Sequence, residues 1–125
     1  MSDQTSLSGL INHQTAAYNT RDLAKFTACY AEDCQILRMP STMPTVSGRA
    51  QLLKEYEMRF RNPALRAEII STMVMGNKVI EQERVYGILE GPIEVLAIYE
   101  IVDGLIQNVW FHFPGAMPAM PVRPA

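Results

Sequence analysis

The sequence predicts an α+β fold in which three N-terminal helices pack on one face of a strongly curved, mainly antiparallel β-sheet. In the first half of the chain, apolar residues recur with the spacing of amphipathic helices. After residue 63 the pattern changes to alternation, and turn sequences separate the alternating segments. Helices followed by a run of strands are typical of an α+β layout.

The first helix is expected at residues 5–19, where Leu7, Ile11 and other apolar side chains fall on one face. Gln14 is a polar member of that face, which marks it as a residue that points into the interior. A second helix is expected at about residues 22–31, after the break at Asn19–Asp22.

The segment CQILRM is predicted to be a short strand, and the segment PSTMPTVS, with two prolines, is predicted to be a loop. Ser47 is the expected cap of a third helix that runs to about Phe60, and Asn62-Pro63 stops it. Four strands then follow, near residues 65–75, 78–89, 93–102 and 105–113.

Alternate residues of a strand face opposite sides of a sheet, so parity assigns the two faces. The odd positions of strand 93–102 form the cleaner apolar face and are expected to look toward the helices, as is Val109 in the last strand. The opposite face would expose apolar side chains such as Leu96, Ile98, Ile106 and Trp110. Such a patch indicates a partner, and we expect a homodimer through the outer sheet face.

Composition limits the classes of partner. The 125 residues are enough for one domain, placed at residues 1–113, with a Pro/Met-rich tail at 114–125. The formal net charge of −2 provides no basic surface, so neither nucleic acid nor an anionic membrane is an expected partner. The N-terminal residues show no signal peptide and no apolar run is long enough to span a bilayer, which predicts a cytoplasmic location.

Metal and cofactor sites have little support in the sequence. Cys29 and Cys34 do not form a CxxC motif and are interpreted as core residues. His13 and His112 are far apart in the chain, without the spacing of a zinc site. We therefore expect no metal and no cofactor.

The stretch QERVYGI attracts attention because Gln82, Arg84 and Tyr86 share one face of a predicted strand. That face is expected to be buried. A buried guanidinium without an anion costs several kcal/mol, so Arg84 either lines a ligand site or forms a structural salt bridge. Glu81 and Glu83 have the opposite parity and reach the interior only through a β-bulge; Glu57 is another possible partner.

The stretches AYNTRDLAKFTACYAEDCQI, SGRAQLLKEY and VDGLIQNVWFHF together resemble the nuclear transport factor 2-like superfamily. The resemblance covers residues ~5–113 and implies a cone-shaped α+β barrel around a deep pocket. The superfamily includes ketosteroid isomerases, SnoaL-like polyketide cyclases and limonene epoxide hydrolases. A pocket of this kind implies a small lipophilic molecule as the ligand.

The local sequence ERVY is similar to the ERVD of limonene epoxide hydrolases, and RMP is similar to their NMP. Of the five functional positions of that family, only its arginine is kept, at Arg84. Its tyrosine and asparagine fall on Ile36 and Arg38, and its two aspartates fall on Tyr86 and Phe111.

The ketosteroid isomerase pattern is also altered. The oxyanion-hole tyrosine of those enzymes falls on Gln14, the general base on Arg38, and the protonated aspartate on Tyr99. The aspartate of polyketide cyclases falls on Phe111. The usual catalytic carboxylates are therefore replaced.

The resemblance and the parity assignment together predict the site. Arg84, Tyr86 and Tyr99 are the expected catalytic residues, as hydrogen-bond donors to an oxyanion. The expected pocket residues are Gln14, Arg38, Gln82, Val109, Phe111 and Phe113. The predicted function is isomerisation, cyclisation or epoxide opening of a lipophilic ring substrate; the alternative is a non-catalytic dimeric binding module for a small hydrophobic ligand. An inward-facing carboxylate would favour the enzyme.

Overall fold

The computed structural model describes residues 3–114, and this part of the chain forms three helices and six strands. The helices are α1 (Asp3–Thr20), α2 (Leu23–Ala28) and α3 (Arg49–Arg59). The strands are β1 (Tyr30–Arg38), β2 (Pro44–Ser47), β3 (Arg66–Met75), β4 (Lys78–Tyr86), β5 (Ile93–Val102) and β6 (Leu105–His112). Apart from its first residue, the predicted tail at 114–125 lies outside the described residues.

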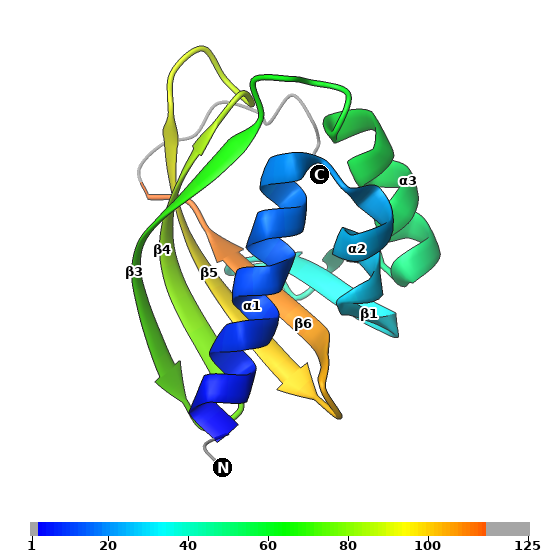
Figure 1. Cartoon of the computed structure of the whole chain (residues 1–125), viewed down its shortest axis with the longest axis vertical. Coiled ribbons are helices and arrows are strands. Elements are labelled where there is room, and N and C mark those ends of the chain that lie inside the picture. The colour runs from blue at the N-terminus through cyan, green and yellow to red at the C-terminus, as the bar shows by residue number, and fades with distance from the viewer. Residues whose placement is uncertain (1–2, 115–125) are drawn as a thin grey trace.

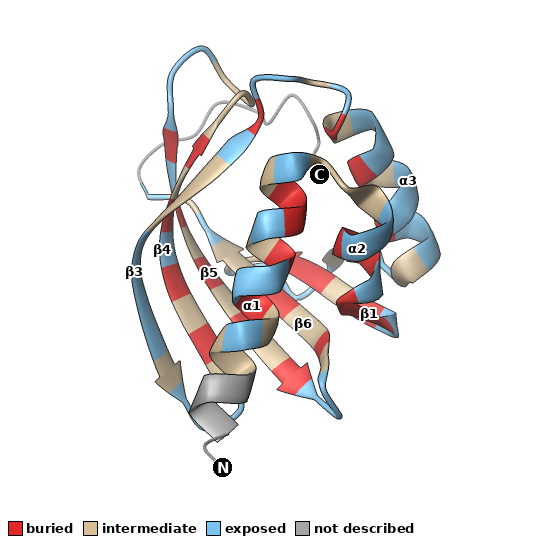
Figure 2. Cartoon of the chain, in the orientation of Figure 1, coloured by how far each residue is buried: buried red, intermediate tan, exposed pale blue. Residues whose placement is uncertain are grey.

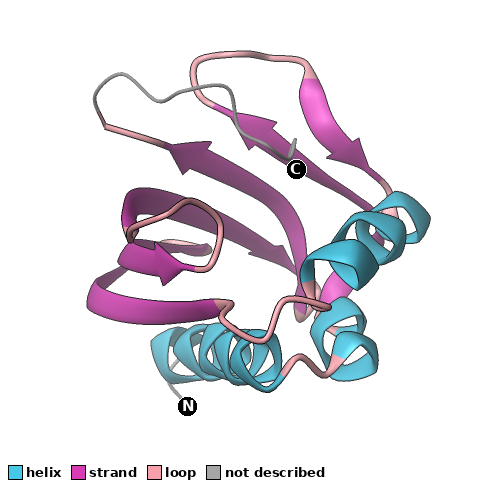
Figure 3. Cartoon of the chain, turned by 90° about the horizontal axis from the view of Figure 1, so that it is seen from above, coloured by secondary structure: helices cyan, strands magenta, loops and turns pink. Residues whose placement is uncertain are grey.

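All six strands form one sheet in the order β2-β1-β6-β5-β4-β3. Neighbouring strands are antiparallel except β1 and β6, which run parallel. The sheet curves strongly, and the helices lie on the concave side of it (Figure 1 and Figure 3). The two outermost strands, β2 and β3, do not pair with each other, so the sheet stays open. The predicted α+β fold, with its curved and mainly antiparallel sheet, is confirmed.

The boundaries of the helices follow local capping. Asp22 accepts a hydrogen bond from the Lys25 backbone N–H at 3.1 Å and so caps α2. The expected cap of α3 was wrong: Gly48, at φ +94°, precedes the helix, because its missing side chain permits that conformation. The Ser47 backbone N–H instead donates to Gln51 Oε1 at 2.8 Å.

The second helix and the segment after β1 also differ from expectation. The helix ends at Ala28, and Tyr30 already belongs to β1, which pairs with β6. Residues 44–47 form β2 rather than loop, with Val46 opposite Ile36. Pro44 is tolerated because β2 is an edge strand, where a proline costs no central ladder bond.

The core is built on an aromatic cluster that joins the three helices. The Phe26 ring is 1% exposed and lies 4.7 Å from the Tyr56 ring and 5.3 Å from the Phe60 ring, measured between centroids. Tyr18 of α1 meets the Phe60 ring edge-on at 5.5 Å. Offset and edge-on pairs of this kind add to the stabilisation from burial.

The parity of β5 and most of β6 is confirmed. Ile93, Val95 and Ala97 are buried, and buried positions alternate along the strand on the face toward α1 (Figure 2). Val109 is fully buried, as expected. Ile106, which parity placed outside, is also fully buried, because the pairing of β5 with β6 shifts register after Glu100.

Among the helices described, none combines the length and the apolar composition needed to cross a membrane. The cytoplasmic location and the homodimer stay predictions.

Candidate functional site

A pocket of about 550 Å³ lies between the concave face of the sheet and the helices. Gln14 and Tyr18 of α1, and Tyr56 and Arg59 of α3, contribute to its walls. Apolar side chains of the sheet complete it, among them Val85, Ile93, Val95, Phe111 and Phe113. A mostly apolar cavity with a few polar groups is typical of a small-molecule site.

Glu83 is the acidic group at the bottom of this pocket. Its residue is 6% exposed, and it lines the cavity from the middle of β4. Tyr99 of β5, which is 3% exposed and also lines the cavity, donates a hydrogen bond from its hydroxyl to Glu83 Oε2 at 2.9 Å. This hydrogen bond fixes the carboxyl group in place.

Glu81 stands beside Glu83, two residues earlier on the same face of β4. It is 1% exposed, and its Oε2 accepts a hydrogen bond from the Thr72 hydroxyl at 3.3 Å. Its other oxygen, Oε1, is buried without a hydrogen-bond partner among the described residues. Two adjacent buried carboxylates repel each other. Protonation of Glu83 removes one of the two charges, and its O–H group, when it points to Glu81, supplies the hydrogen-bond donor that Glu81 Oε1 lacks.

Burial, reinforced by the adjacent Glu81 charge, raises the pKa of Glu83 to about 8. The pKa of Glu81 is also raised by burial, while the hydrogen bond with Glu83 acts in the opposite direction. A carboxyl with a pKa near neutrality is both a usable acid and a usable base, which is the property that general acid–base catalysis requires.

Neutral donors surround the carboxyl pair. Burial raises the pKa of Tyr99 well above its usual value, so its hydroxyl keeps its proton. Tyr30, fully buried under α1, donates its hydroxyl to Gln14 Oε1 at 3.1 Å. This arrangement leaves the Gln14 amide N–H group, on the pocket wall, as a donor to a ligand.

Charged groups also line the pocket at half-exposed positions. The Arg38 guanidinium lies over the Phe113 ring at 4.5 Å, and the Arg59 guanidinium lies over the Tyr56 ring at 4.6 Å. Glu55, one turn before Arg59 on α3, is a half-exposed acidic residue that also lines the pocket. The expected alternative Glu57 is exposed and does not line the pocket.

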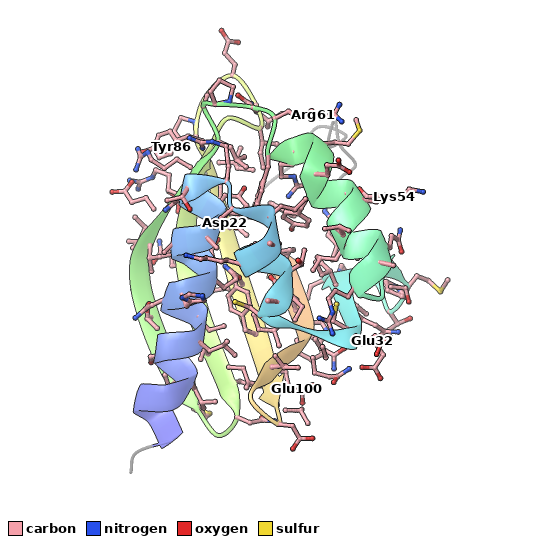
Figure 4. All side chains as sticks on the ribbon, turned by 45° about the vertical axis from the view of Figure 1, so that its right-hand side comes forward. Asp22, Glu32, Lys54, Arg61, Tyr86 and Glu100 are labelled. Atoms are coloured by element: carbon pink, nitrogen blue, oxygen red, sulfur yellow. The ribbon has the colours of Figure 1, made fainter. Side chains whose placement is uncertain are left out.

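The predicted placement of Arg84 and Tyr86 was wrong, because both residues face away from the pocket. Arg84 Nε donates to Glu94 Oε2 at 3.2 Å, and its guanidinium also lies 3.6 Å from Glu68 Oε1. The Tyr86 hydroxyl donates to Glu68 at 3.1 Å, and Figure 4 shows Tyr86 at the rim of the molecule, away from α3. Of the two alternatives for Arg84, the structure therefore contains the salt bridge.

Gln82 shares this outward parity and was misplaced for the same reason. It is exposed, and it accepts a hydrogen bond from the Ser71 hydroxyl at 3.2 Å on the outer surface. Val109 faces inward but belongs to the packed core rather than the cavity wall. The expected pocket positions of Gln14, Arg38, Tyr99, Phe111 and Phe113 are confirmed as lining residues, while their roles stay predictions.

Glu81 and Glu83 are the site residues that the sequence reasoning assigned to the wrong face. No bulge is needed to bring them inside, because β4 alternates regularly from Val79 to Val85 with all odd positions buried. The apolar residues at both ends of this series were the available signal. Within residues 3–114, no group of three or more acidic, cysteine or histidine side chains is placed to hold a metal ion.

Comparison with known proteins identifies a family that matches most of the chain. The family model of the SnoaL-like domain matches residues 11–109. The comparison with curated proteins gives no match.

Solved structures resemble the chain over most of its length. A cystatin-fold protein from Novosphingobium aromaticivorans superposes with a TM-score of 0.77 at 22% identity, over 85% of this chain and 96% of that one. A "putative ketosteroid isomerase" from Kribbella flavida has a TM-score of 0.77 at 20% identity, over 95% and 85%. A "putative polyketide cyclase" from Sinorhizobium meliloti has a TM-score of 0.70 at 20% identity, over 82% and 93%. At these identities the likeness shows the shared fold.

Proposed function

Because the chain belongs to the SnoaL-like domain family, we propose that it is an enzyme that moves a proton on a lipophilic ring substrate, as an isomerase or a cyclase. The observation that carries this proposal is the Glu83 carboxyl, buried at the bottom of the pocket with a pKa of about 8. An inward carboxylate was the feature expected to separate an enzyme from a simple binding module.

In the proposed step, ionised Glu83 removes a proton from the carbon next to a carbonyl group of the ligand. The C–H electron pair moves into the carbonyl, which gives an enolate, and the Glu83 carboxyl now carries the proton. The Gln14 amide N–H group is placed on the pocket wall to donate to the developing oxyanion. In a β,γ-unsaturated substrate this enolate is a dienolate. Protonated Glu83 returns the proton to its γ carbon, the electron pair on oxygen re-forms the carbonyl, and the C=C bond moves between the α and β carbons.

The surroundings support this role for Glu83. The wall contributed by Val85, Ile93 and Val95 gives the pocket an apolar surface that suits an apolar ring. The Tyr99 hydroxyl holds the carboxyl oriented at 2.9 Å while its own proton stays in place. Burial, together with the adjacent Glu81 charge, raises the pKa of Glu83 to about 8, which suits acid–base catalysis near neutral pH.

The test is conversion of cyclohex-3-enone to its conjugated isomer, together with α-proton exchange of 2-tetralone in D₂O by NMR. Cyclohexene oxide extends the panel to epoxide opening, in which water attacks a ring carbon and protonated Glu83 donates its proton to the oxygen of the C–O bond that breaks. We expect Glu83→Gln to lower the rate by about 10²–10⁴-fold, the usual contribution of a positioned acid–base group. The matched control is Glu94→Gln, because Glu94 lies on the exposed outer face of the adjacent strand.

Equal rates for the wild-type protein and Glu83→Gln would contradict the assignment of Glu83. Binding of every compound without conversion of any would favour the second candidate, a non-catalytic dimeric binding module. The apolar pocket wall is the observation that favours this candidate.

For either candidate we propose a homodimer through the outer sheet face. The half-buried side chains of Leu96, Ile98 and Trp110 lie on this face, and Ile98 is directly opposite Trp110 in the pairing of β5 with β6. Apolar side chains that gather on an outer sheet face are typical of an interface. Analytical ultracentrifugation at micromolar concentration tests this: a species of twice the chain mass is expected, and a monomer contradicts it.

A further inference from the structure

We infer that the mouth of the pocket binds an anionic group of the ligand, so that the ligand is a lipophilic ring compound that carries a carboxylate or a similar anion. Arg38 is the principal group that would hold this anion, and Arg59 is the second. The inference about binding stands on these side chains alone; naming the ligand as a substrate rests on the proposed function.

Arg38 and Arg59 both lie in the more exposed part of the pocket. Both line the cavity and both are half-exposed, whereas Glu83 and Tyr99 are buried. Arg38 comes from the end of β1 and Arg59 from the last turn of α3, so the cationic groups are contributed by two separate elements. The polar groups are therefore arranged by depth, with acid–base chemistry at the bottom and positive charge near the opening.

Arg38 is held in a conformation that suits anion binding. The central carbon of its guanidinium lies 4.5 Å from the centroid of the Phe113 ring. A guanidinium can pack on an aromatic ring and still donate hydrogen bonds from its N–H groups to a ligand. These N–H groups match the two oxygens of a carboxylate.

Among the described residues, the positive charge of Arg38 is not neutralised by an ion pair. Among residues 3–114, no carboxylate lies within ion-pair distance of Arg38, whereas Arg84 on the outer face contacts both Glu68 and Glu94. A half-buried cation that lines a ligand pocket and has no ion-pair partner among these residues is suited to bind an anion. Arg59 adds a second positive charge, and Glu55 removes one, so the sum of the three charges is +1.

The charges of Glu81, Glu83 and Arg38 determine the orientation in which a ligand binds. An anionic group at the bottom of the pocket would meet the Glu81 and Glu83 pair, which is buried and already carries negative charge. At the mouth it meets Arg38 instead. The ligand is therefore expected to bind with its apolar ring beside Glu83 and its anion at Arg38.

The test uses two probes with one ring skeleton. 1-Anilinonaphthalene-8-sulfonate carries an anionic group, N-phenyl-1-naphthylamine lacks it, and both become fluorescent in apolar sites. We expect Arg38→Gln to weaken binding of the sulfonate about tenfold and to change binding of the neutral probe less than about twofold, as for loss of a hydrogen bond to a charged group. We also expect added salt to weaken binding of the sulfonate and to leave binding of the neutral probe unchanged.

The matched control is Arg66→Gln, because Arg66 is stacked in the same way, 4.3 Å from the Tyr86 ring, on a surface outside the pocket. This variant is expected to bind both probes as the wild-type protein does. The neutral probe must also displace the sulfonate, which confines both to one site. Parallel loss of both probes in Arg38→Gln, unchanged sulfonate binding, or absence of competition would each overturn the inference.

The result is independent of catalysis, because the readout is binding and neither probe is converted. Failure of Arg38→Gln to discriminate the probes leaves the Glu83 rate test intact. Conversely, an unchanged rate in Glu83→Gln removes the proposed enzyme and leaves an anion-selective pocket.

Discussion

The pH dependence of folding gives a quantitative prediction for Glu83. Its pKa is about 8 in the folded chain, against an ordinary value of 4.5, so between these two values the folded chain holds a proton that the unfolded chain has lost. The free energy of unfolding therefore falls as pH rises through this window. The stabilisation is complete at low pH and is lost as the pH passes about 8. The slope is at most about 1.4 kcal/mol per pH unit.

Between pH 6 and pH 8 these values give a loss of about 2 kcal/mol for the wild-type protein. Glu83→Gln keeps the shape of the side chain but has no proton to lose, so its loss over the same interval is expected to be below about 0.5 kcal/mol. Urea unfolding followed by circular dichroism at both pH values measures the difference. Glu94→Gln, on the outer face, is expected to retain the wild-type slope. A Glu83→Gln variant with the wild-type slope would refute the reasoning.

Three further predictions follow from neighbouring features. Glu81→Gln removes the charge beside Glu83 and is expected to lower the pKa of Glu83, which moves the midpoint of the pH–stability curve below about 8; an unmoved midpoint contradicts this. Arg84→Gln is expected to leave binding of the neutral naphthylamine unchanged, because Arg84 faces away from the pocket, and weaker binding of that probe would return Arg84 to the site. Gly87→Ala is expected to lower the free energy of unfolding by about 1–3 kcal/mol in urea titrations, since Gly87 has φ +96° and an added Cβ would lie 2.8 Å from the backbone of Ala64. Gly76→Ala, at φ +60° with open space around it, is the control, and an equal loss for both would show that the close approach is not the cause.

The fold was predictable because its main signals are local. The odd positions of β5 are aliphatic except for Tyr99, so alternation alone identifies the inner face of that strand. Asp22 is a recognisable helix cap. The edge strand β2 was missed because it is short and begins at Pro44, which is typical of a loop. The burial of Ile106 was missed because a register shift cannot be seen in the pattern of one strand.

The site was predicted only in part because β4 is ambiguous by composition. Its odd positions carry two glutamates, and its even positions carry Arg84 and Tyr86, so neither face is apolar throughout. The inward face is decided by partners on other strands, since Tyr99 and Thr72 donate to the two carboxyls. These long-range hydrogen bonds compensate the burial of acidic groups, and no local pattern in β4 reveals them.

The most direct test of the central claim is a ¹³C NMR titration of the glutamate side-chain carboxyls, with Glu83→Gln used to assign the signal. A buried Glu83 that holds a proton inside the pocket is expected to titrate with a midpoint near 8. A Glu83 signal that titrates near the ordinary value of 4.5 would contradict the account.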